Sequence, residues 1–256
     1  MDLNLKDQVA VVTGASRGIG LAITRTLVQE GVRVIAGARH RTPELAELSG
    51  VEVVEADLST PAGPADLVAA AHGRIDILVN NVGAVTPRLT GFLDVTDDQW
   101  LQSLNLNLMA AIRTTRAALP SMIEAGHGSI VTVSSVNAFL PDQLVIDYSA
   151  AKAALTNFSK ALSKEVGAHG IRVNTVSPGP VTTDLWLGEK GMAATVGQAK
   201  GADPGGVAES VAAQAETGRF THPQEVADLV VFLASDRAGN VTGTDFVIDG
   251  GLTKTL

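Results

Sequence analysis

The sequence predicts an α/β domain in which a doubly wound parallel sheet of about seven strands carries helices on both faces. Three observations lead to this fold class. Short β-branched runs alternate along the chain with helical patterns. Most of the runs are apolar on both faces, which is typical of strands in a buried parallel sheet. The first run passes through a glycine-rich turn directly into a helical pattern, as in Rossmann-type folds.

The strands are expected, in chain order, at Val9–Val12, Arg33–Ala36, Val51–Glu55, Ile75–Asn80, Ser129–Val133, Arg172–Val176 and Asp245–Ile248. Helices are expected between them at Ile19–Gln29, Pro64–Ala71, Asp97–Leu119, Tyr148–Ala168 and Pro223–Ser235. Two capping boxes are predicted at helix starts, one formed by Thr96 with Gln99 and one by Thr221 with Gln224.

Residues 184–219 stand apart, because they are rich in Gly and Ala and contain no strand pattern. A connection of this length in a compact domain is usually functional. We therefore expect a substrate lid at about 184–219, with a surface excursion of short helices as the alternative. The whole chain, 1–256, is predicted to be one NAD(P)-binding domain that includes this segment, because 256 residues suit a single α/β unit.

Composition excludes several classes of protein. Hydrophobic residues make up 45% and charged residues 18% of the chain, which argues against disorder. The net charge of -8 argues against a nucleic-acid partner, because phosphate backbones require a basic face. The absence of cysteine excludes disulfides, thiol nucleophiles and Cys-bound zinc, and no two histidines are spaced as a helical metal pair, so no metal is expected.

No signal pattern or membrane-length apolar run is visible, and a cytoplasmic protein without a membrane partner is expected.

A dinucleotide site is predicted where the first strand meets the first helix. The turn reads Thr13-Gly14-Ala15-Ser16-Arg17-Gly18-Ile19-Gly20. Glycines allow a phosphate to approach the backbone closely, and the N-terminus of the next helix attracts that anion. The spacing is G-x-x-x-G-x-G rather than G-x-G-x-x-G, and turn chemistry alone is the weaker alternative.

The end of the second strand favours NADP(H) over NAD(H). An acidic residue there would accept the ribose hydroxyls of NAD, whereas this chain reads Ala36-Gly37-Ala38-Arg39. Arg39, together with Arg17 of the glycine turn, suits a 2′-phosphate. The alternative is that Arg39 is a solvated surface charge.

Two further strand ends carry polar groups. Asp57, in Ala56-Asp57-Leu58, could accept a hydrogen bond from the adenine amino group, or it could equally be a helix N-cap. The Asn80-Asn81-Val82-Gly83 turn ends the fourth strand, where backbone approaches a ligand in folds of this kind. A plain Asn/Gly turn is the alternative.

The chemical centre is predicted at Tyr148 and Lys152. Tyr148 is the only tyrosine of the chain, and Lys152 lies four residues later, on the same helix face. A free phenol has a pKa of about 10, and an ammonium about 4 Å away contributes ~4 kcal/mol at an effective dielectric of 20. That energy corresponds to about three pKa units, so the pair could act as a general acid/base near neutrality. Taken alone, an ordinary amphipathic helix would be the better interpretation.

These motifs together resemble the short-chain dehydrogenase/reductase family in its compact single-domain branch. The resemblance runs from Thr13 to Gly251, through the motifs above and through Asn107, Ser134-Ser135, Ser177-Pro178-Gly179-Pro180, Thr242-Gly243-Thr244 and Ile248-Asp249-Gly250-Gly251. Each motif is modest, and their order along the chain makes the set specific.

The resemblance implies a role for each matching residue. Tyr148 would donate a proton to the carbonyl oxygen, and Lys152 would lower the Tyr148 pKa and bind the nicotinamide ribose. Ser135 would hydrogen-bond the same carbonyl oxygen. It is preferred to Ser134 because it precedes Tyr148 by thirteen residues. Asn107 would hold a water that links Lys152 to solvent, and Asn105 is ranked lower.

The cofactor would contact residues that follow several strands, together with the first turns of the helix at 148–168: Gly14, Ser16, Arg17, Gly18, Ile19, Gly20, Arg39, Asp57, Leu58, Asn81, Gly83, Tyr148, Lys152, Pro178, Gly179, Val181 and Thr183. Two residues depart from the family pattern. Val82 stands where the family usually has alanine, which adds methyl groups without removing a hydrogen bond. Ala138 stands where the family often has glycine, in a loop that borders the substrate.

Substrate contacts are expected from Phe139, Val145 and Trp186, and the apolar surroundings favour a neutral or hydrophobic carbonyl compound, although some of these side chains could pack against the protein itself. Arg88 could meet an acidic substrate or carrier, and an exposed salt bridge is the preferred alternative. A 3-oxoacyl-thioester reductase stays open, as does a non-catalytic dinucleotide sensor. The resemblance also implies a homotetramer with the helices at 97–119 and 148–168 in an interface.

Overall fold

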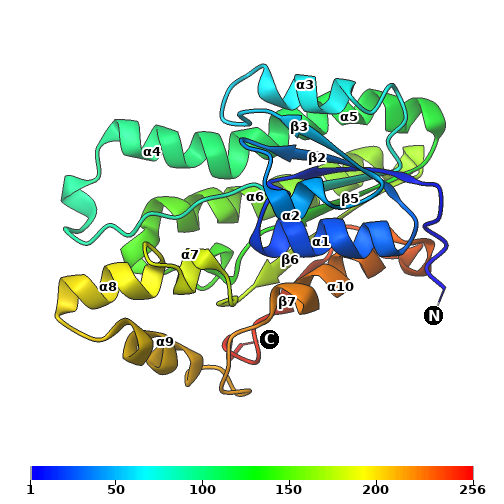
Figure 1. The fold of residues 1–256 in the computed structure, drawn as a ribbon. Coiled ribbons are helices and arrows are strands. Elements are labelled where there is room, and N and C mark those ends of the chain that lie inside the picture. The colour runs from blue at the N-terminus through cyan, green and yellow to red at the C-terminus, as the bar shows by residue number, and fades with distance from the viewer. Residues whose placement is uncertain (1, 256) are drawn as a thin grey trace.

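Seven parallel strands form the centre of the computed structural model, which describes residues 2–255 (Figure 1). Their hydrogen-bonded order is β3-β2-β1-β4-β5-β6-β7, so the order reverses between β1 and β4. The strands are β1 (Val9–Thr13), β2 (Arg33–Ala38), β3 (Val51–Glu55), β4 (Ile77–Asn80), β5 (Gly128–Val133), β6 (Ile171–Pro178) and β7 (Asp245–Ile248). The predicted fold class is confirmed, and ligands of such sheets bind outside the strand ends at the point of reversal.

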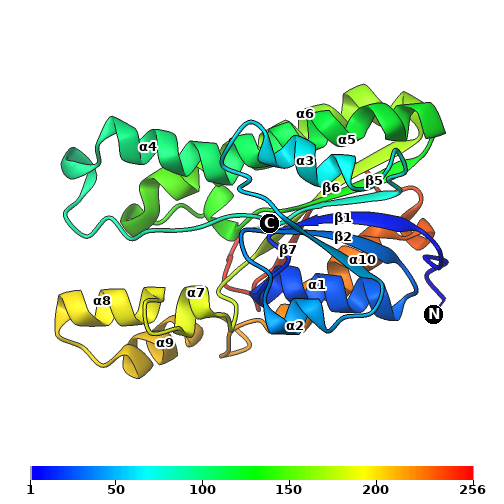
Figure 2. The ribbon, with the colours of Figure 1, turned by 45° about the horizontal axis from the view of Figure 1, so that its top comes forward.

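Helices cover both faces of the sheet (Figures 1 and 2). One layer holds α1 (Gly18–Gln29), α2 (Pro43–Ala46) and α10 (Pro223–Ala234). The other holds α3 (Gly63–Ala69), α5 (Ala110–Ala125) and α6 (Ile146–Val166), with α4 (Asp97–Leu104) leading into α5. Within residues 2–255, no helix is both long and apolar enough to span a bilayer.

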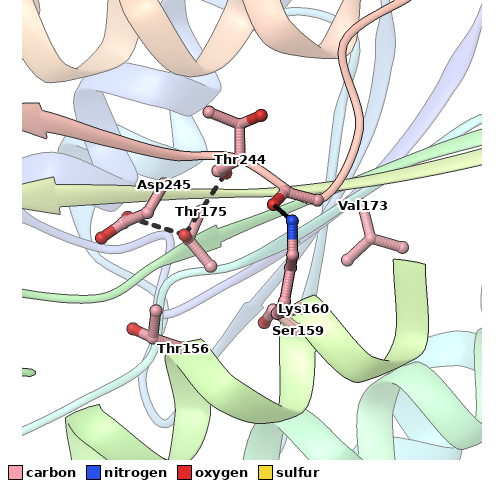
Figure 3. Close-up of a pocket in the computed structure, with 8 residues that line it drawn as sticks. Thr156, Ser159, Lys160, Val173, Thr175, Thr244 and Asp245 are labelled. Atoms are coloured by element: carbon pink, nitrogen blue, oxygen red, sulfur yellow. Dashed lines mark hydrogen bonds between the residues drawn. The ribbon is translucent and has the colours of Figure 1, made fainter. Parts of the chain in front are cut away.

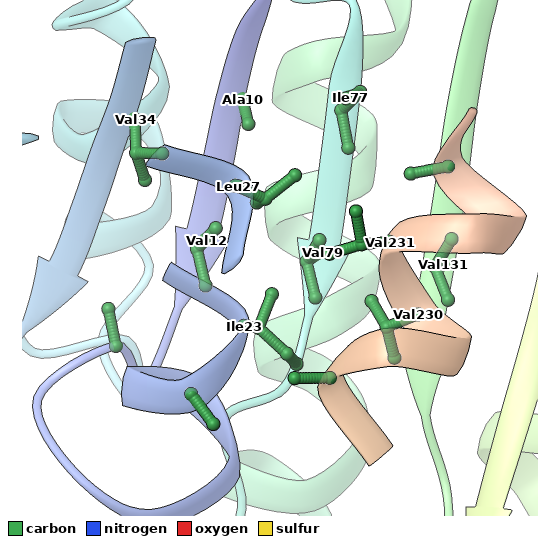
Figure 4. Packing of buried hydrophobic residues seen from close by; sticks show 14 of the residues in the cluster. Ala10, Val12, Ile23, Leu27, Val34, Ile77, Val79, Val131, Val230 and Val231 are labelled. Atoms are coloured by element: carbon green, nitrogen blue, oxygen red, sulfur yellow. The ribbon is translucent and has the colours of Figure 1, made fainter. Parts of the chain in front are cut away.

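Two buried clusters, one on each face, hold the layers together. On the first face, Ile23 and Leu27 of α1 and Val230 and Val231 of α10 pack over strands β1, β4 and β5 (Figure 4). All four side chains have no exposed surface. At about 1.5–3 kcal/mol for each fully buried aliphatic side chain, such packing fixes the strand ends that carry the site.

The segment 184–219 contains no strand, and it folds into α7 (Asp184–Leu187), α8 (Met192–Lys200) and α9 (Pro204–Ala212). These helices stand beside the sheet, at the end of the molecule away from the N-terminus (Figure 1). Short helices were expected only for the alternative of a surface excursion, but they are equally compatible with a lid, so the role of a lid stays a proposal.

One predicted helix is interrupted. Instead of a continuous helix over 97–119, the chain forms α4, a π-helical turn at Asn105–Met109, and then α5. The Asn107 side-chain amide donates to the carbonyl oxygen of Ser103 at 3.0 Å. This is the i−4 carbonyl that the Asn107 backbone N–H would use in an α-helix, so the side chain competes with the regular ladder. Such turns are frequent at functional sites.

The two capping-box predictions have different outcomes. The box at α4 is confirmed: the Gln99 N–H donates to Thr96 Oγ1 at 3.3 Å, and the Thr96 N–H donates to Gln99 Oε1 at 3.0 Å. The box at α10 is wrong by one residue, because the N-cap is His222 and its N–H donates to Glu225 Oε2 at 2.7 Å. Pro223 explains the shift: it occupies the first helical position and forces the residue before it to be extended.

Candidate active site

The glycine turn forms a cradle at the carboxyl end of β1. Gly14 and Gly18 have φ of +65° and +54°, a conformation that side chains disfavour. A Cβ on Gly20 would lie 2.1 Å from the carbonyl oxygen of Gly14, so only glycine allows α1 to start this close to the strand. The turn ends at the N-terminus of α1, where unpaired N–H groups attract an anion. These residues therefore fit the pyrophosphate of a dinucleotide.

The fourth-strand turn is joined to this cradle by hydrogen bonds. Thr13 Oγ1 accepts from the N–H groups of Asn81 at 2.8 Å and Val82 at 3.0 Å. In return, the Asn81 side-chain amide donates to the carbonyls of Thr13 at 3.0 Å and Gly14 at 3.1 Å. Asn81 is thus a structural link between the ends of β1 and β4. Val82 packs against the second core cluster and disturbs none of these bonds.

The end of β2 is basic. Ala38 is buried there, whereas Arg39 is exposed. Asp57, across from it after β3, accepts hydrogen bonds from the Ser59 hydroxyl at 2.7 Å and the Ser59 N–H at 3.0 Å. These bonds hold the pKa of Asp57 below its usual value, and the charge of Arg39 adds to the effect. Arg39 and Asp57 therefore share one edge of the site.

Asp57 is not a helix N-cap, since α3 begins at Gly63 after Ala62. Leu58, which follows it, is buried.

Tyr148 and Lys152 lie together near the start of α6. Lys152 Nζ is 5.6 Å from the centre of the Tyr148 ring. It donates to the carbonyl oxygen of Val133 at 2.9 Å, at the end of β5, and the side chain is almost fully buried. The position that a Cβ on Gly83 would take is 3.6 Å from the same Nζ. The ends of β4 and β5 and the first turns of α6 thus meet at this ammonium group.

Burial, rather than the neighbouring charge, dominates both pKa values. Burial raises the pKa of Tyr148, and interaction with the Ser135 side chain lowers it by a smaller amount. Burial also lowers the pKa of Lys152 to about 8. The i,i+4 spacing predicted the contact between the two side chains but not their desolvation. At neutral pH, Tyr148 is therefore a phenol that can donate a proton, beside a lysine that is still mostly charged.

The two serines at the end of β5 face different neighbours. Ser135 interacts with Tyr148, and its Oγ also accepts from the Asn137 N–H at 3.2 Å. Ser134 instead contacts Thr156 of α6, with 2.7 Å between the two hydroxyl oxygens. The geometry places Ser135, and not Ser134, beside the phenol.

The two asparagines of the π-helical turn also point in different directions. Asn107 is buried, and its Oδ1 accepts from the Ala84 N–H at 3.0 Å while its amide donates to the Ala84 carbonyl at 2.9 Å. Its Oδ1 is 3.0 Å from the Cβ position of Gly83, on the Lys152 side. Asn105 donates to the carbonyl of Ser59, away from Lys152. The π-helical turn thus brings Asn107 to the site.

The segment after β6 crosses from the sheet to the glycine turn. Gly179 has no room for a side chain, because its Cβ would lie 2.8 Å from the Asp249 Cβ. Val181 is buried and pairs as an isolated bridge with Thr221. The methyl group of Thr183 would lie 3.2 Å from a Cβ on Gly18, so the predicted nicotinamide-side segment does approach the phosphate cradle.

A cavity of about 440 Å³ lies between the segment before α6 and the helices α7 to α9. Trp186 lines it, and its ring meets Phe220 edge to face at 5.3 Å. The other two predicted substrate contacts, Phe139 and Val145, are 44% and 3% exposed, and neither is among the residues that line this cavity. The lining is Asp142, Leu144, Trp186, Met192, Val196, Lys200, Ala202, Asp203, Gly206, Val207, Ser210, Val211 and Gln214.

A second cavity, of about 140 Å³, lies between α6, β6 and β7 (Figure 3). Lys160 points into it and donates to the Gly243 carbonyl at 2.6 Å, and Thr175 donates to Asp245 at 2.6 Å. Lys160 lies two helical turns beyond Lys152 on α6, so this cavity is separate from the predicted chemical centre.

Sequence reasoning missed the partner of Arg88. Its guanidinium binds the carboxylate of Asp147, with Nη2 2.5 Å from Oδ2. The pair is not the exposed salt bridge that was expected, because the two side chains are only 11% and 3% exposed. Arg88 and Asp147 are 59 residues apart, and nothing in their local sequence signals the contact.

A dinucleotide cradle beside a half-buried tyrosine and a buried lysine and serine defines a nucleotide-dependent oxidoreductase acting on CH–OH and carbonyl groups. Comparisons with known proteins give the particular family. The family model described as Enoyl-(Acyl carrier protein) reductase matches residues 14–253. The chain belongs to this family of short-chain dehydrogenases/reductases.

Relatives within the family differ in what they act on. The chain is 35% identical to the 3-oxoacyl-[acyl-carrier-protein] reductase FabG of Escherichia coli, over 98% of this chain and 99% of the relative. It is 36% identical to D-threitol dehydrogenase of Mycolicibacterium smegmatis, over 98% and 95%. A solved structure of L-sorbose reductase from Gluconobacter frateurii, complexed with NADPH and L-sorbose, matches with a TM-score of 0.91 and 35% identity over the full length of both chains.

Proposed function

We propose that this oxidoreductase is an NADP(H)-dependent carbonyl reductase that interconverts a ketone or aldehyde and an alcohol on a small neutral or hydrophobic substrate. The observation that carries the proposal is the meeting of Tyr148, Lys152 and Ser135 at the carboxyl edge of the sheet, next to the glycine cradle. These groups can bind a carbonyl oxygen and protonate it.

The basic end of β2 supports NADP(H) as the cofactor. Ala38 leaves no carboxylate for the ribose hydroxyls, and exposed Arg39 can pair with a 2′-phosphate. Arg17, the exposed N-cap residue of α1, adds a second positive charge in the glycine turn. The structural relative was solved with NADPH. When bound, the cofactor supplies the hydride that reduces the carbonyl carbon.

The chain's own residues supply the proton and its stabilisation. Ser135 donates a hydrogen bond to the carbonyl oxygen, where negative charge develops. Tyr148, held in its protonated form, gives its proton to that oxygen. The Lys152 ammonium, fixed by the Val133 carbonyl, stabilises the phenolate that remains and binds the nicotinamide ribose. Asn107 holds the water through which Lys152 and Tyr148 are reprotonated. Alcohol oxidation runs through the same groups in reverse.

The lid cavity supports a neutral substrate. Leu144, Trp186, Met192 and Val196 give it an apolar wall, and Ser210 and Gln214 add uncharged polar groups. Its charged lining residues, Asp142, Lys200 and Asp203, include only one cation, which does not favour an anionic substrate. A 3-oxoacyl-thioester substrate is the second candidate, favoured by the similarity to the Escherichia coli relative. Arg88 argues against an acidic carrier. The sequence made it a candidate cation for such a partner, but it is already paired with Asp147.

The proposal is tested by rates of NADPH and NADH oxidation with a panel of carbonyl compounds: an alkyl ketone, an aromatic ketone, a ketose such as L-sorbose, and a 3-oxoacyl thioester. We expect turnover with NADPH, a much lower rate with NADH, and the highest kcat/KM for a neutral substrate. A preference for NADH would overturn the cofactor assignment. Tight NADPH binding without turnover of any compound would overturn the enzymatic function.

We also propose a homotetramer, in which the region of α4, α5 and α6 forms an interface. Phe92, Leu93 and Leu101 support it, since they lie before and on α4 and are 61%, 93% and 63% exposed. Exposed apolar groups gathered in one region mark association surfaces. Light scattering of the eluted protein should give four times the mass of the chain, and Leu101→Glu should reduce the assembly. A monomer at micromolar concentration would contradict the proposal.

A further inference from the structure

The buried ion pair between Arg88 and Asp147 lies at the border of the proposed active site. Arg88 belongs to the segment that connects β4 to α4, and Asp147 lies in the first turn of α6, immediately before Tyr148. Nη2 and Nε of Arg88 both donate to Asp147 Oδ2, at 2.5 and 3.2 Å. Guanidinium forks of this kind fix geometry as well as charge.

Asp147 depends on Arg88 for its hydrogen bonds. Its Oδ1 is buried and has no hydrogen-bond partner among residues 2–255. Its Oδ2 accepts from Arg88 only, again within those residues. A buried carboxylate that loses its one cationic partner is strongly disfavoured. The contact therefore persists because separating the two side chains would require a large free energy.

Residue 88 is tied to the start of α6 a second time, through its backbone. The Arg88 N–H donates to the Leu144 carbonyl oxygen at 2.6 Å, and Leu144 lines the lid cavity. Four residues earlier, Ala84 exchanges two hydrogen bonds with Asn107. The 84–88 segment is thus fastened at one end to the proposed proton-relay asparagine, and at the other to both the cavity wall and the residue before Tyr148.

We propose that Arg88 and Asp147 are positioning residues for the reduction, an inference that rests on the proposed role of Tyr148. By clamping the 84–88 segment onto residues 144–147, the pair fixes the wall at Leu144 relative to the Tyr148 hydroxyl. The substrate carbonyl then meets Tyr148 and Ser135 at reacting distance. A displacement of about 1 Å in such geometry can reduce the rate about 100-fold.

Three variants test the proposal against a purely structural role. Arg88→Met removes the guanidinium and keeps an apolar stem. Arg88→Lys keeps a charge without the fork. The double variant Arg88→Met/Asp147→Leu removes the buried charges together, which is often neutral or favourable for stability. Arg33→Met is the matched control, since Arg33 pairs with Glu52 at 3.7 Å at an exposed position on β2 and β3. For each protein, kcat, KM, NADPH Kd and Tm are measured.

We expect Arg88→Met to lower kcat by about 10- to 100-fold, with the NADPH Kd changed less than twofold. The double variant should recover Tm but not kcat, Arg88→Lys should recover kcat in part, and Arg33→Met should behave as the wild type.

If Arg88→Met does not fold, the double variant and Arg88→Lys decide the question. Wild-type kcat in the double variant would overturn the inference. Tyr148→Phe is assayed in parallel. Retained turnover in Tyr148→Phe would mean that the proposed function has failed, whereas loss of turnover there together with wild-type kcat in the double variant would mean that only the inference about Arg88 and Asp147 has failed.

Discussion

The cofactor edge of this molecule and its proposed lid, residues 184–219, are built in different ways. At the cofactor edge, a Cβ on Gly20 would lie 2.1 Å from the Gly14 carbonyl oxygen, so the chain is closely packed there. Thr13 Oγ1 alone makes three hydrogen bonds with β4 and the turn that follows it. At the lid, three short helices surround a cavity of about 440 Å³, and Leu185 and Leu187 are 43% and 51% exposed. Close packing holds the groups that bind the cofactor in one geometry. The helices of the proposed lid are packed more loosely, so their arrangement can vary with the substrate.

This contrast gives an ordered set of expectations. Changes at the chemical centre should lower turnover most and leave binding unchanged. Changes at the cofactor edge should affect the choice of cofactor, and changes at the lid should affect the substrate alone.

After Tyr148→Phe, which is taken up last, the largest effect is expected from Ser135→Ala. Removing one donor to a developing oxyanion typically lowers kcat about 10²- to 10³-fold. The NADPH Kd should stay the same, because Ser135 faces Tyr148 rather than the glycine cradle. Ser134→Ala is the matched control, since Ser134 contacts Thr156 instead. A larger loss in Ser134→Ala than in Ser135→Ala would exchange the two roles.

The next effect is expected at the cofactor edge. Arg39→Ala should lower kcat/KM with NADPH about 10- to 100-fold, the amount that a charge-assisted hydrogen bond of ~1.5–3 kcal/mol contributes. The rate with NADH should change little, so that the preference narrows or reverses. Arg25→Ala, at an exposed position on α1, serves as the control. Equal losses of kcat/KM with NADPH and with NADH would contradict the assignment of Arg39 to the 2′-phosphate.

A smaller effect is expected at the lid. Trp186→Ala should raise KM for the carbonyl substrate by about tenfold, in keeping with the loss of ~1–3 kcal/mol of apolar contact. The NADPH Kd should not change, because Trp186 lines the lid cavity and contacts Phe220, not the glycine cradle. Steady-state kinetics with the best substrate of the panel measure the effect. An unchanged KM would place the substrate elsewhere.

The pH dependence of reduction should report on Lys152, which stands between the two regions. Its pKa is lowered to about 8 by burial, so the ammonium is present below that value and is lost as the pH rises through it. The rate of carbonyl reduction should therefore fall above pH 8, and at one pH unit above the pKa it should be about a tenth of its low-pH value if only the charged form acts. A rate that stays level to pH 10 would contradict a role for the Lys152 charge.

Those parts of the molecule that depend on local pattern were predictable from the sequence. Short β-branched runs predicted every strand of the sheet, and the glycine spacing predicted the cradle at Gly14 to Gly20. The i,i+4 spacing placed Tyr148 and Lys152 together. All of these follow from helical or strand periodicity, which the sequence displays directly.

Features that depend on tertiary contacts were not predictable. The π-helical turn that orients Asn107 arises from its competition for the Ser103 carbonyl, and the Arg88–Asp147 pair joins residues far apart in the chain. Desolvation of Tyr148 depends on the packing of β5 and α6, so a charge estimate from spacing alone gave the wrong dominant effect. The cavity proposed for the substrate is made by helices whose arrangement no periodicity specifies.

The most direct test of the account is Tyr148→Phe, because Tyr148 is the proposed proton donor of the reduction. Turnover of the best carbonyl substrate with NADPH is measured together with the NADPH Kd in the same preparation. The account predicts a loss of turnover of about 10³-fold or more, with Kd unchanged, since the ring remains and only the proton donor is removed. Near-normal turnover in Tyr148→Phe would contradict the account, since another group would then protonate the substrate.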